Sequence, residues 1–310
     1  MNLKFVLLSH FKSWNLEALA RESADSLHQT YSLNFIPSRK MEIHHLLSLL
    51  KLFFVKGATL IYFNQNSLFA YPRLATRVMS RNRVRVWVSH FDDIQGLTKS
   101  QLQLLSDCDL IFVQNLNLQS TLVSLGTSFS KIKVIRGAID YSLFKPNPNQ
   151  VQERVIITGF CKPRKNPEAV HKIITANPTI SFLIHGNGWE AYFSRLGGTP
   201  PNCHYSAFNY KDQPKLISNS TCLLSLATEE GGPLSILESL ACGTPVLASP
   251  VGFWPDIVSQ NNGEVLDFND DPISFSNRFH RMKSLKLQVQ ERDLTGGIYS
   301  FSNLAKALLE

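Results

Sequence analysis

The chain has 310 residues, of which 44% are hydrophobic and 18% charged, and its formal net charge is +7. This composition is typical of a folded globular protein long enough for two domains, and it excludes a largely disordered chain. No stretch approaches the roughly 20 apolar residues that are needed to cross a bilayer. The five cysteines are scattered and form no Cys-x-x-Cys pair, which argues against a zinc site or a disulfide framework.

The positive charge is confined to the first half of the chain. Residues 1–150 hold 17 Lys and Arg against 9 Asp and Glu, a balance of +8, whereas residues 151–310 hold 14 against 15. A basic half predicts an anionic surface or an anionic substrate on that side of the protein.

The first half alternates short apolar runs with amphipathic segments, a pattern typical of a parallel α/β sheet. The expected strands are Lys4–Ser9, Thr59–Asn64, Arg83–His90, Leu110–Gln114 and Lys133–Arg136. The expected helices between them are Leu16–Leu27, Glu42–Phe54, Leu68–Ser80, Lys99–Ser106 and Leu118–Leu125. Together they predict a Rossmann-like domain over residues 1–145.

A linker follows, because the segment 140–150 is rich in Pro and Asn and has no periodicity. The alternation then resumes and predicts a second domain over residues 146–298. Its expected strands are Val155–Gly159, Ser181–His185, Cys222–Leu226 and Pro245–Ala248. Its expected helices are Pro167–Thr175, Pro214–Ser218, Pro233–Ala241 and Ile273–Ser284. The tail 299–310 is expected to form a last helix over Phe301–Leu309.

The most informative stretch is residues 228–248, which read TEEGGPLSILESLACGTPVLA. The pattern predicts a strand end, a glycine turn, a helix that starts near Pro233 and stops near Gly243, and another strand. Glycines ahead of a helix let the backbone approach a ligand closely, and the helix N-terminus favours a phosphate. Glu238 falls on the apolar stripe of this helix, where a carboxylate needs a partner such as ligand hydroxyls.

Glu230 and Glu238, with seven residues between them, together with the run that follows, resemble the E-x7-E signature of the retaining GT-B glycosyltransferases of the GT4 type (glycosyl transferases group 1). The resemblance implies that Glu238 binds the ribose of a nucleotide and that Glu230 contacts the donor sugar. It also implies that the donor lies against the segment made of Gly231, Gly232, Pro233 and Leu234. The alternative from the residues alone is an ordinary crossover helix with Glu238 exposed.

The loop at 159–166 resembles the family's Gly-Arg-x-x-x-x-Lys loop, whose two cations clamp the donor diphosphate. Lys165 matches the lysine, and the resemblance implies that it stabilises the leaving group. Phe160 occupies the position of the arginine. Either Arg164 or Lys162 could supply the second cation.

Two further positions follow from the resemblance. The loop that contains Gly188 is similar to a Gly-x-Gly loop near the nucleotide, although a short glycine motif has low specificity. His90 stands at the end of a strand where the family often carries a histidine near the donor sugar. The alternative for His90 is a structural histidine.

The resemblance implies a GT-B fold, in which two Rossmann-like α/β domains face a central cleft, the first on the acceptor side and the second binding the donor. It implies a retaining glycosyltransferase that uses a nucleotide-sugar and needs no metal or other cofactor. Asp107 and Asp109 imitate an Asp-x-Asp metal motif but directly precede a buried strand, so we do not assign them as ligands.

Two rival functions remain open at the level of sequence. One is a phosphorylase-like or epimerase-like GT-B enzyme, which requires a different phosphate site. The other is a non-catalytic protein that binds sugar nucleotides or glycans. The feature that favours this alternative is Phe160, which stands in place of the family's arginine.

The expected acceptor is a glycan or a lipid-linked hydroxyl. The basic first half and the apolar Glu42–Phe54 helix indicate a cytoplasmic protein that associates peripherally with an anionic inner membrane face. The sequence contains no motif for binding nucleic acid.

Overall fold

The computed structural model describes residues 5–9, 31–35, 54–88, 96–147, 151–267, 270–289 and 292–309. The chain divides into two compact units. The first comprises Met1–Gly137 and Phe301–Glu310, and the second comprises Ala138–Ser300. The division falls before the linker expected at 140–150, because Phe144 is fully buried in the second unit and Ile139 N donates to Tyr299 O over 2.8 Å.

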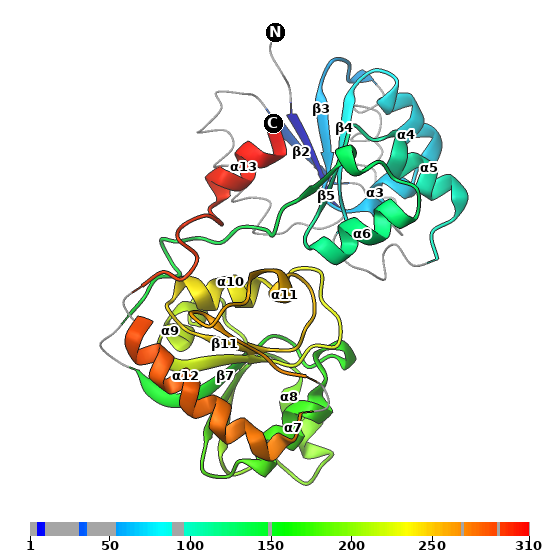
Figure 1. The fold of residues 1–310 in the computed structure, drawn as a ribbon. Coiled ribbons are helices and arrows are strands. Elements are labelled where there is room, and N and C mark those ends of the chain that lie inside the picture. The colour runs from blue at the N-terminus through cyan, green and yellow to red at the C-terminus, as the bar shows by residue number, and fades with distance from the viewer. Residues whose placement is uncertain are drawn as a thin grey trace. The chain divides into compact units, whose positions relative to one another are not determined.

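The first unit contains a six-stranded parallel sheet with the order β2-β1-β3-β4-β5-β6 (Figure 1). Val86 in the middle of this sheet lies opposite Tyr62 on one neighbouring strand and Ile111 on the other. The strands are β1 (Phe5–Ser9), β2 (Tyr31–Phe35), β3 (Thr59–Tyr62), β4 (Arg83–Val88), β5 (Leu110–Val113) and β6 (Ile132–Val134).

Four helices of the first unit follow its strands, and their apolar side chains pack with alternate residues of β3, β4 and β5 into one core. They are α3 (Gln65–Phe69), α4 (Pro72–Met79), α5 (Lys99–Asp107) and α6 (Leu116–Ser124). The C-terminal helix α13 (Phe301–Leu309) also belongs to this unit. Its last turn is held there because the buried Arg85 donates to Leu308 O and Lys133 donates to Ala307 O.

The second unit contains another six-stranded parallel sheet, with the order β12-β11-β10-β7-β8-β9. If β7 to β12 are numbered 1 to 6 and the sheet is read from the β9 edge, the order is 3-2-1-4-5-6, as in dinucleotide-binding domains. The strands are added toward one edge from β7 to β9 and toward the other edge from β10 to β12, so the strand order reverses between β7 and β10. The strands are β7 (Gln152–Thr158), β8 (Ser181–His185), β9 (Cys203–Ser206), β10 (Ser220–Ser225), β11 (Val246–Ala248) and β12 (Gly263–Val265).

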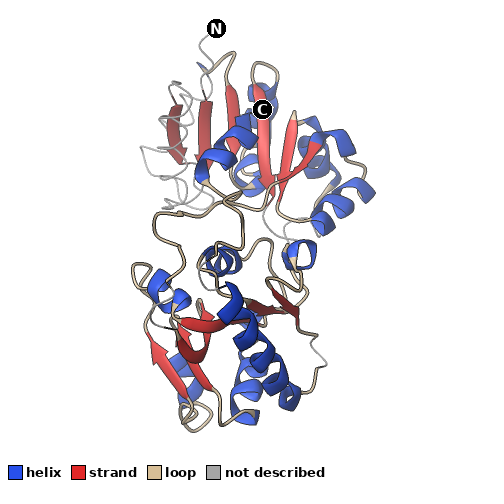
Figure 2. Ribbon diagram, turned by 60° about the vertical axis from the view of Figure 1, so that its left-hand side comes forward, coloured by secondary structure: helices blue, strands red, loops and turns tan. Residues whose placement is uncertain are grey.

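Helices cover both faces of the second sheet, as Figures 1 and 2 show, and each face has its own core. Neighbouring residues of one strand serve opposite cores, with Val155 in one and Ile156 in the other, because strand side chains alternate. One face carries α7 (Pro167–Ala176), α8 (Trp189–Ser194) and α12 (Phe275–Val289). The other carries α9 (Gln213–Ser218), α10 (Leu234–Ala241) and α11 (Trp254–Ile257).

Every strand expected from the sequence overlaps a strand of the structure, and the strands that were not expected are β2, β9 and β12. All three lie at sheet edges, where a strand is partly exposed and need not be a continuous apolar run. The helix expected over Leu68–Ser80 is divided into α3 and α4, since Pro72 lacks an N–H and begins a new helix.

The expected helices Leu16–Leu27 and Glu42–Phe54 lie outside the described residues, apart from Phe54 itself. Within the described part of the chain, no helix has both the length and the apolar character that crossing a membrane requires.

Candidate active site

The candidate site lies at the carboxyl ends of β7 and β10, the two neighbouring strands at which the strand order of the second sheet reverses. This is the position where open α/β sheets bind ligands. The loop after β7 carries Arg164 and Lys165, and the loop after β10 carries Glu230. Backbone bonds join the loops, since Thr228 N donates to Arg164 O over 2.8 Å. The fold therefore brings together two segments that lie about 65 residues apart in sequence.

Two cations share one carboxylate oxygen at this site. Arg164 Nη1 lies 2.6 Å and Lys165 Nζ lies 2.5 Å from Glu230 Oε1. The Glu230 side chain is only 6% exposed. Burial by itself would raise the pKa of Glu230, but Lys165 and Arg164 outweigh it and hold that pKa below its usual value. The cluster thus has one more positive than negative charge.

Local backbone geometry sets the directions of both cations. Pro163–Lys165 form a single 3-10 turn, and Asn166 ends it at φ 53°, in the left-handed region. Asn166 then caps α7 by accepting from Ala169 N over 3.3 Å. Gly159, at φ 106°, adopts a backbone conformation that favours glycine and lies in contact range of Lys165, because a Cβ there would lie 3.7 Å from Lys165 Cε.

The structure brings Arg164, rather than Lys162, to the partner of Lys165. Lys162 Nζ instead lies over the ring of Phe160, 5.9 Å from its centroid. Phe160 is 48% exposed and packs its ring against Phe208. The position that the resemblance assigns to an arginine therefore holds an exposed ring, and the second cation comes from four residues further along the same loop.

The glycine turn before α10 packs closely against a third loop, the one that contains Gly252. Gly252 adopts φ 61°, and a Cβ at this position would approach Pro233 Cδ to 2.9 Å and Glu230 O to 3.1 Å. Pro233 is the N-cap of α10, so the helix begins at Leu234, one residue later than expected. Among the described residues no side chain caps this N-terminus, although Ile236 N donates to Pro233 O over 2.9 Å, and a helix N-terminus favours an anion.

Glu238 lies one turn inside α10 and is 3% exposed. Gln213 Nε2 donates to Glu238 Oε2, and the Tyr210 hydroxyl lies 3.5 Å from Glu238 Oε1. Burial raises the pKa of Glu238 to about 7, although both hydrogen bonds oppose the rise. Gln213 had no signal in the sequence, because a glutamine at the start of a short helix normally faces solvent.

The Gly188 loop lies directly beside the loop after β7. Gly188 caps α8 at φ 86°, and a Cβ there would lie 3.4 Å from Cys161 Cβ. At Gly186 a Cβ would overlap the carbonyl oxygen of Gly159. Close packing of the two loops therefore requires a glycine at Gly186, whereas the positive φ of Gly188 is what favours a glycine there.

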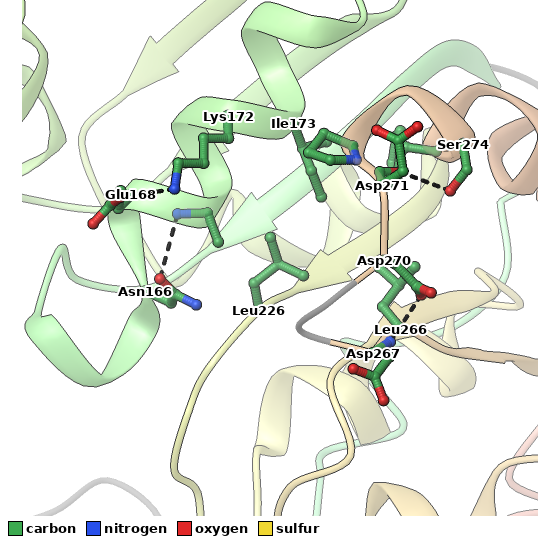
Figure 3. Close-up of a pocket in the computed structure, with 13 residues that line it drawn as sticks. Asn166, Glu168, Lys172, Ile173, Leu226, Leu266, Asp267, Asp270, Asp271 and Ser274 are labelled. Carbon is green, nitrogen blue, oxygen red and sulfur yellow. Dashed lines mark hydrogen bonds and ion pairs between the residues drawn. The ribbon is translucent and has the colours of Figure 1, made fainter.

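A pocket of about 400 Å³ opens on the α7 side of the cation pair (Figure 3). Asn166, Lys172 and Leu226 line it together with several carboxylates. These carboxylates have local partners, as in the pair Lys172–Glu168 at 2.8 Å and the bond from Asp267 N to Asp270 Oδ2 at 2.9 Å. Its acidic wall is unsuited to a diphosphate.

Some expectations cannot be placed or have other roles. His90 lies outside the described residues. Asp109 Oδ2 accepts a hydrogen bond from Val84 N over 2.7 Å, and Asp107 Oδ1 accepts one from Gln103 Nε2 over 2.8 Å. Both carboxylates thus serve the local structure around β4 and α5.

Residues 140–293, nearly the whole second unit, match the family model described as Glycosyl transferases group 1. The second unit of the chain is thus similar to this glycosyltransferase family. The chain is 22% identical over 238 residues to one subunit of human phosphatidylinositol N-acetylglucosaminyltransferase, covering 71% of this chain and 49% of that protein. It is 24% identical over 179 residues to D-inositol 3-phosphate glycosyltransferase of Mycobacterium bovis (strain BCG / Pasteur 1173P2), covering 51% of this chain and 37% of that protein.

These matches span half or less of the length of the curated relatives. Solved structures cover the whole chain. Anabaena HepE in complex with UDP gives a TM-score of 0.73 at 13% identity, covering 100% of this chain and 98% of that one. The lipopolysaccharide outer core galactosyltransferase WaaB gives 0.67 at 14% identity, covering 99% of both. The expected two-domain GT-B fold with Rossmann-like units is thereby confirmed.

Proposed function

We propose that this chain transfers a sugar, with retention of configuration, from a nucleotide-activated donor to a hydroxyl acceptor. The observation that carries the proposal is the convergence of Lys165, Arg164 and Glu230 next to the uncapped N-terminus of α10, at the switch point of the second sheet. UDP is the first nucleotide to test, because the similar solved structure of Anabaena HepE contains it.

The charge at this site suits a diphosphate. Two cations share one carboxylate, so a surplus of one positive charge remains, and the helix dipole adds to it. A diphosphate would draw Lys165 and Arg164 toward its oxygens through charge-assisted hydrogen bonds. The same contacts would strengthen as negative charge develops on the departing diphosphate.

In this proposal Glu230 exchanges partners when the donor binds. Once the diphosphate engages both cations, the Glu230 carboxylate is released to accept hydrogen bonds from hydroxyls of the donor sugar. The low pKa of Glu230 keeps it ionised and thus an acceptor at neutral pH. No carboxylate is assigned as a nucleophile, so we propose a front-face reaction with an oxocarbenium-like transition state.

The nucleoside would be held by α10 and the adjacent glycine loops. Glu238 is proposed to accept hydrogen bonds from the ribose hydroxyls, and the backbone of Gly231 and Gly232 to contact the sugar and diphosphate. His90 is proposed to hydrogen-bond the donor sugar. We propose that no bound metal takes part, since cations of the chain can neutralise the leaving group.

The test is a thermal-shift screen of the full chain with UDP, GDP, ADP and their sugars, followed by hydrolysis and transfer assays on the sugars that bind. A stabilising nucleotide whose sugar is released or transferred supports the proposal. Binding without turnover of any sugar points to the non-catalytic alternative. Release of a sugar phosphate in the presence of inorganic phosphate points to a phosphorylase.

We propose that the acceptor is a glycan or lipid-linked hydroxyl, and that the protein is cytoplasmic and binds the inner membrane face through its first unit. The supporting observation is that residues 54–88 contain six Lys and Arg and no Asp or Glu. Arg73, Arg77, Arg81 and Arg83 in this segment are exposed. Basic side chains of this kind bind anionic lipid surfaces.

A further inference from the structure

Three aromatic rings form a row at the edge of the candidate site. The Phe160 and Phe208 ring centroids lie 5.8 Å apart, and the Phe208 and His185 centroids lie 5.4 Å apart. The row runs from the fully buried His185 to Phe160, which is 48% exposed. Its outer ring therefore has a face that no protein ring covers among the described residues.

Hydrogen bonds fix the buried end of the row. His185 Nδ1 lies 2.9 Å from Ser206 Oγ, and His185 Nε2 lies 3.0 Å from Asn209 O. The imidazole is thus held on one side by the last residue of β9 and on the other by the loop after β9, which carries Phe208. The middle ring consequently rests on a support that cannot rotate freely.

Asn187 ties together the two loops that carry the phenylalanines. Its backbone oxygen accepts from Cys161 N over 2.8 Å, and its side-chain oxygen accepts from Phe208 N over 2.9 Å. Gly186 allows this close approach, as its missing Cβ atom shows. The glycine loop thus sets the distance between the exposed Phe160 ring and the half-buried Phe208 ring.

The row begins on the same loop as the cation pair. Phe160 follows Gly159, which lies in contact range of Lys165, and Arg164 supplies the second cation. Because Lys165 and Arg164 supply the two cations, Phe160 is not needed to bind phosphate. If the diphosphate of a nucleotide contacts Lys165, its base can reach one side of this loop. The base is flat, neutral and polarisable, and such a group packs well against the exposed face of an aromatic ring such as Phe160.

We propose that Phe160 and Phe208 form a stacking platform for the base of the donor nucleotide. This inference rests on the proposed function, and it assigns the base to a surface that reads shape rather than hydrogen bonds. Lys162 Nζ, which lies over the Phe160 ring 5.9 Å from its centroid, adds a cation–π contact to the platform. Stacking of a base on a side-chain ring is tolerant of the identity of the base.

The experiment measures calorimetric binding of the full chain to pyrophosphate and to whichever of UDP, GDP and ADP the wild-type protein binds. Phe160→Ala should weaken nucleotide binding about 10-fold, a typical loss for one stacked base. Phe160→Leu should lose nearly as much, because it keeps an apolar side chain but no ring. Phe160→Tyr should retain wild-type affinity. Binding of pyrophosphate should stay unchanged in all three.

The outcomes separate the platform from the proposed function. If the wild-type chain binds no nucleotide, the proposed function fails. If it binds one and Phe160→Ala or Phe160→Leu binds it equally well, the platform is overturned while the function stands. A parallel loss for pyrophosphate would mean that the loop itself is damaged, and it would overturn the platform too. A loss seen with the sugar nucleotide but not with the free nucleotide would assign the ring to the sugar and overturn the proposal.

Discussion

The first and second units are both built on parallel α/β sheets, yet they differ in how far their positive charges are balanced by acidic residues. In the second unit charges are matched, as where Arg278 bridges Glu264 at 3.1 Å and Asp270 at 2.7 Å. In the first unit the stretch 54–88 has six cations and no acid. An excess of one sign repels itself and favours an oppositely charged partner. The acids of the second unit thus lie next to cations, whereas the stretch 54–88 of the first unit carries an excess of positive charge.

The two units also differ in how their glycines are used. Gly186 and Gly252 of the second unit lie where a Cβ would press on a neighbouring loop. Gly57, Gly96 and Gly126 of the first unit have positive φ, but a Cβ there would meet nothing within 4 Å. Close backbone packing next to a ligand site is thus a property of the second unit, within the described residues.

The largest expected effect comes from removing a cation at the clamp. Lys165→Ala should lower kcat about 100-fold, the usual loss when one charge-stabilising contact to the transition state is removed. Arg164→Ala should have a smaller effect, because its side chain is more exposed than that of Lys165. The measurement is turnover of the nucleotide-sugar found in the screen. Lys283→Ala, an exposed partner of Glu153, is the control and should keep the wild-type rate.

If Lys165→Ala and Arg164→Ala both turned over like wild type, the matched charges of the second unit would have no part in the chemistry. The contrast between the units would then be reduced to surface charge alone.

The next effect tests the basic surface of the first unit. Replacing Arg73 and Arg77 on α4 together by Gln should weaken binding to anionic liposomes about 30-fold, since each basic residue near such a surface contributes about 1 kcal/mol. Sedimentation at low and high salt measures it, and salt should weaken wild-type binding because 0.1 M salt screens charges over about 10 Å.

The matched control is the pair Arg281→Gln and Lys283→Gln on α12 of the second unit, which removes the same charge from the other unit. Equal losses from both pairs, or equal binding to neutral liposomes, would show that the first unit has no special role at a membrane.

Glu238→Gln tests the ribose contact and has a pH signature. It should weaken nucleotide binding about 10-fold, because a charged acceptor roughly doubles the strength of a hydrogen bond. Wild-type affinity should fall as pH drops through about 7, where Glu238 becomes protonated. The variant should lack that fall. Calorimetric titrations between pH 6 and 8 compare them, and parallel pH curves would remove Glu238 from the site.

The same group should affect stability in the opposite sense. The pKa of Glu238 is higher in the folded protein than in the unfolded chain, so the folded state binds more protons between about 4.5 and 7. Burial of the carboxylate therefore destabilises the fold increasingly as pH rises through that window, and Glu238→Gln should remove this loss.

Much of the fold could be read from the sequence because both sheets are parallel and buried. Inner strands such as β5 and β8 contain the continuous apolar runs LIFV and FLI, with glycine, proline or polar residues between such runs. The strands that were not expected, β2, β9 and β12, all lie at sheet edges, where a strand need not be a continuous apolar run, although the edge strand β6 was expected. The exact start of α10 depends on the close packing of Gly252 against Pro233, which has no local signal in the sequence.

The candidate site could be predicted only in part. Motif spacing identified Glu230, Glu238 and Lys165, since these types stand at fixed distances from glycines and strand ends. The choice between Arg164 and Lys162 required the turn at Asn166, which depends on a left-handed backbone that no local pattern indicates. Contacts between loops far apart in sequence, such as that of Asn187 with Phe208, leave no local signal either.

The smallest expected effect concerns Lys286 on α12, which the sequence did not single out. Its side chain is 1% exposed, and its ammonium donates to Gly243 O over 2.9 Å and to Thr244 Oγ1 over 2.8 Å. It thus holds the turn directly after α10, the helix that carries Glu238. Burial lowers the pKa of Lys286 to about 8, which corresponds to a loss of about 3 kcal/mol in the stability of the charged form.

Lys286→Met should therefore change stability at pH 7 by only about 1 kcal/mol, because relief of the buried charge offsets two lost hydrogen bonds. The sign of the pH effect is fixed. Between pH 8 and 10.5 the unfolded chain holds the Lys286 proton more tightly, so wild-type stability should rise relative to the variant across that window. Thermal unfolding of both proteins from pH 7 to 10 measures the difference. A stability difference between the two proteins that stays constant across this range would mean that burial does not lower the pKa of Lys286, and that the contacts after α10 carry no cost from a buried charge.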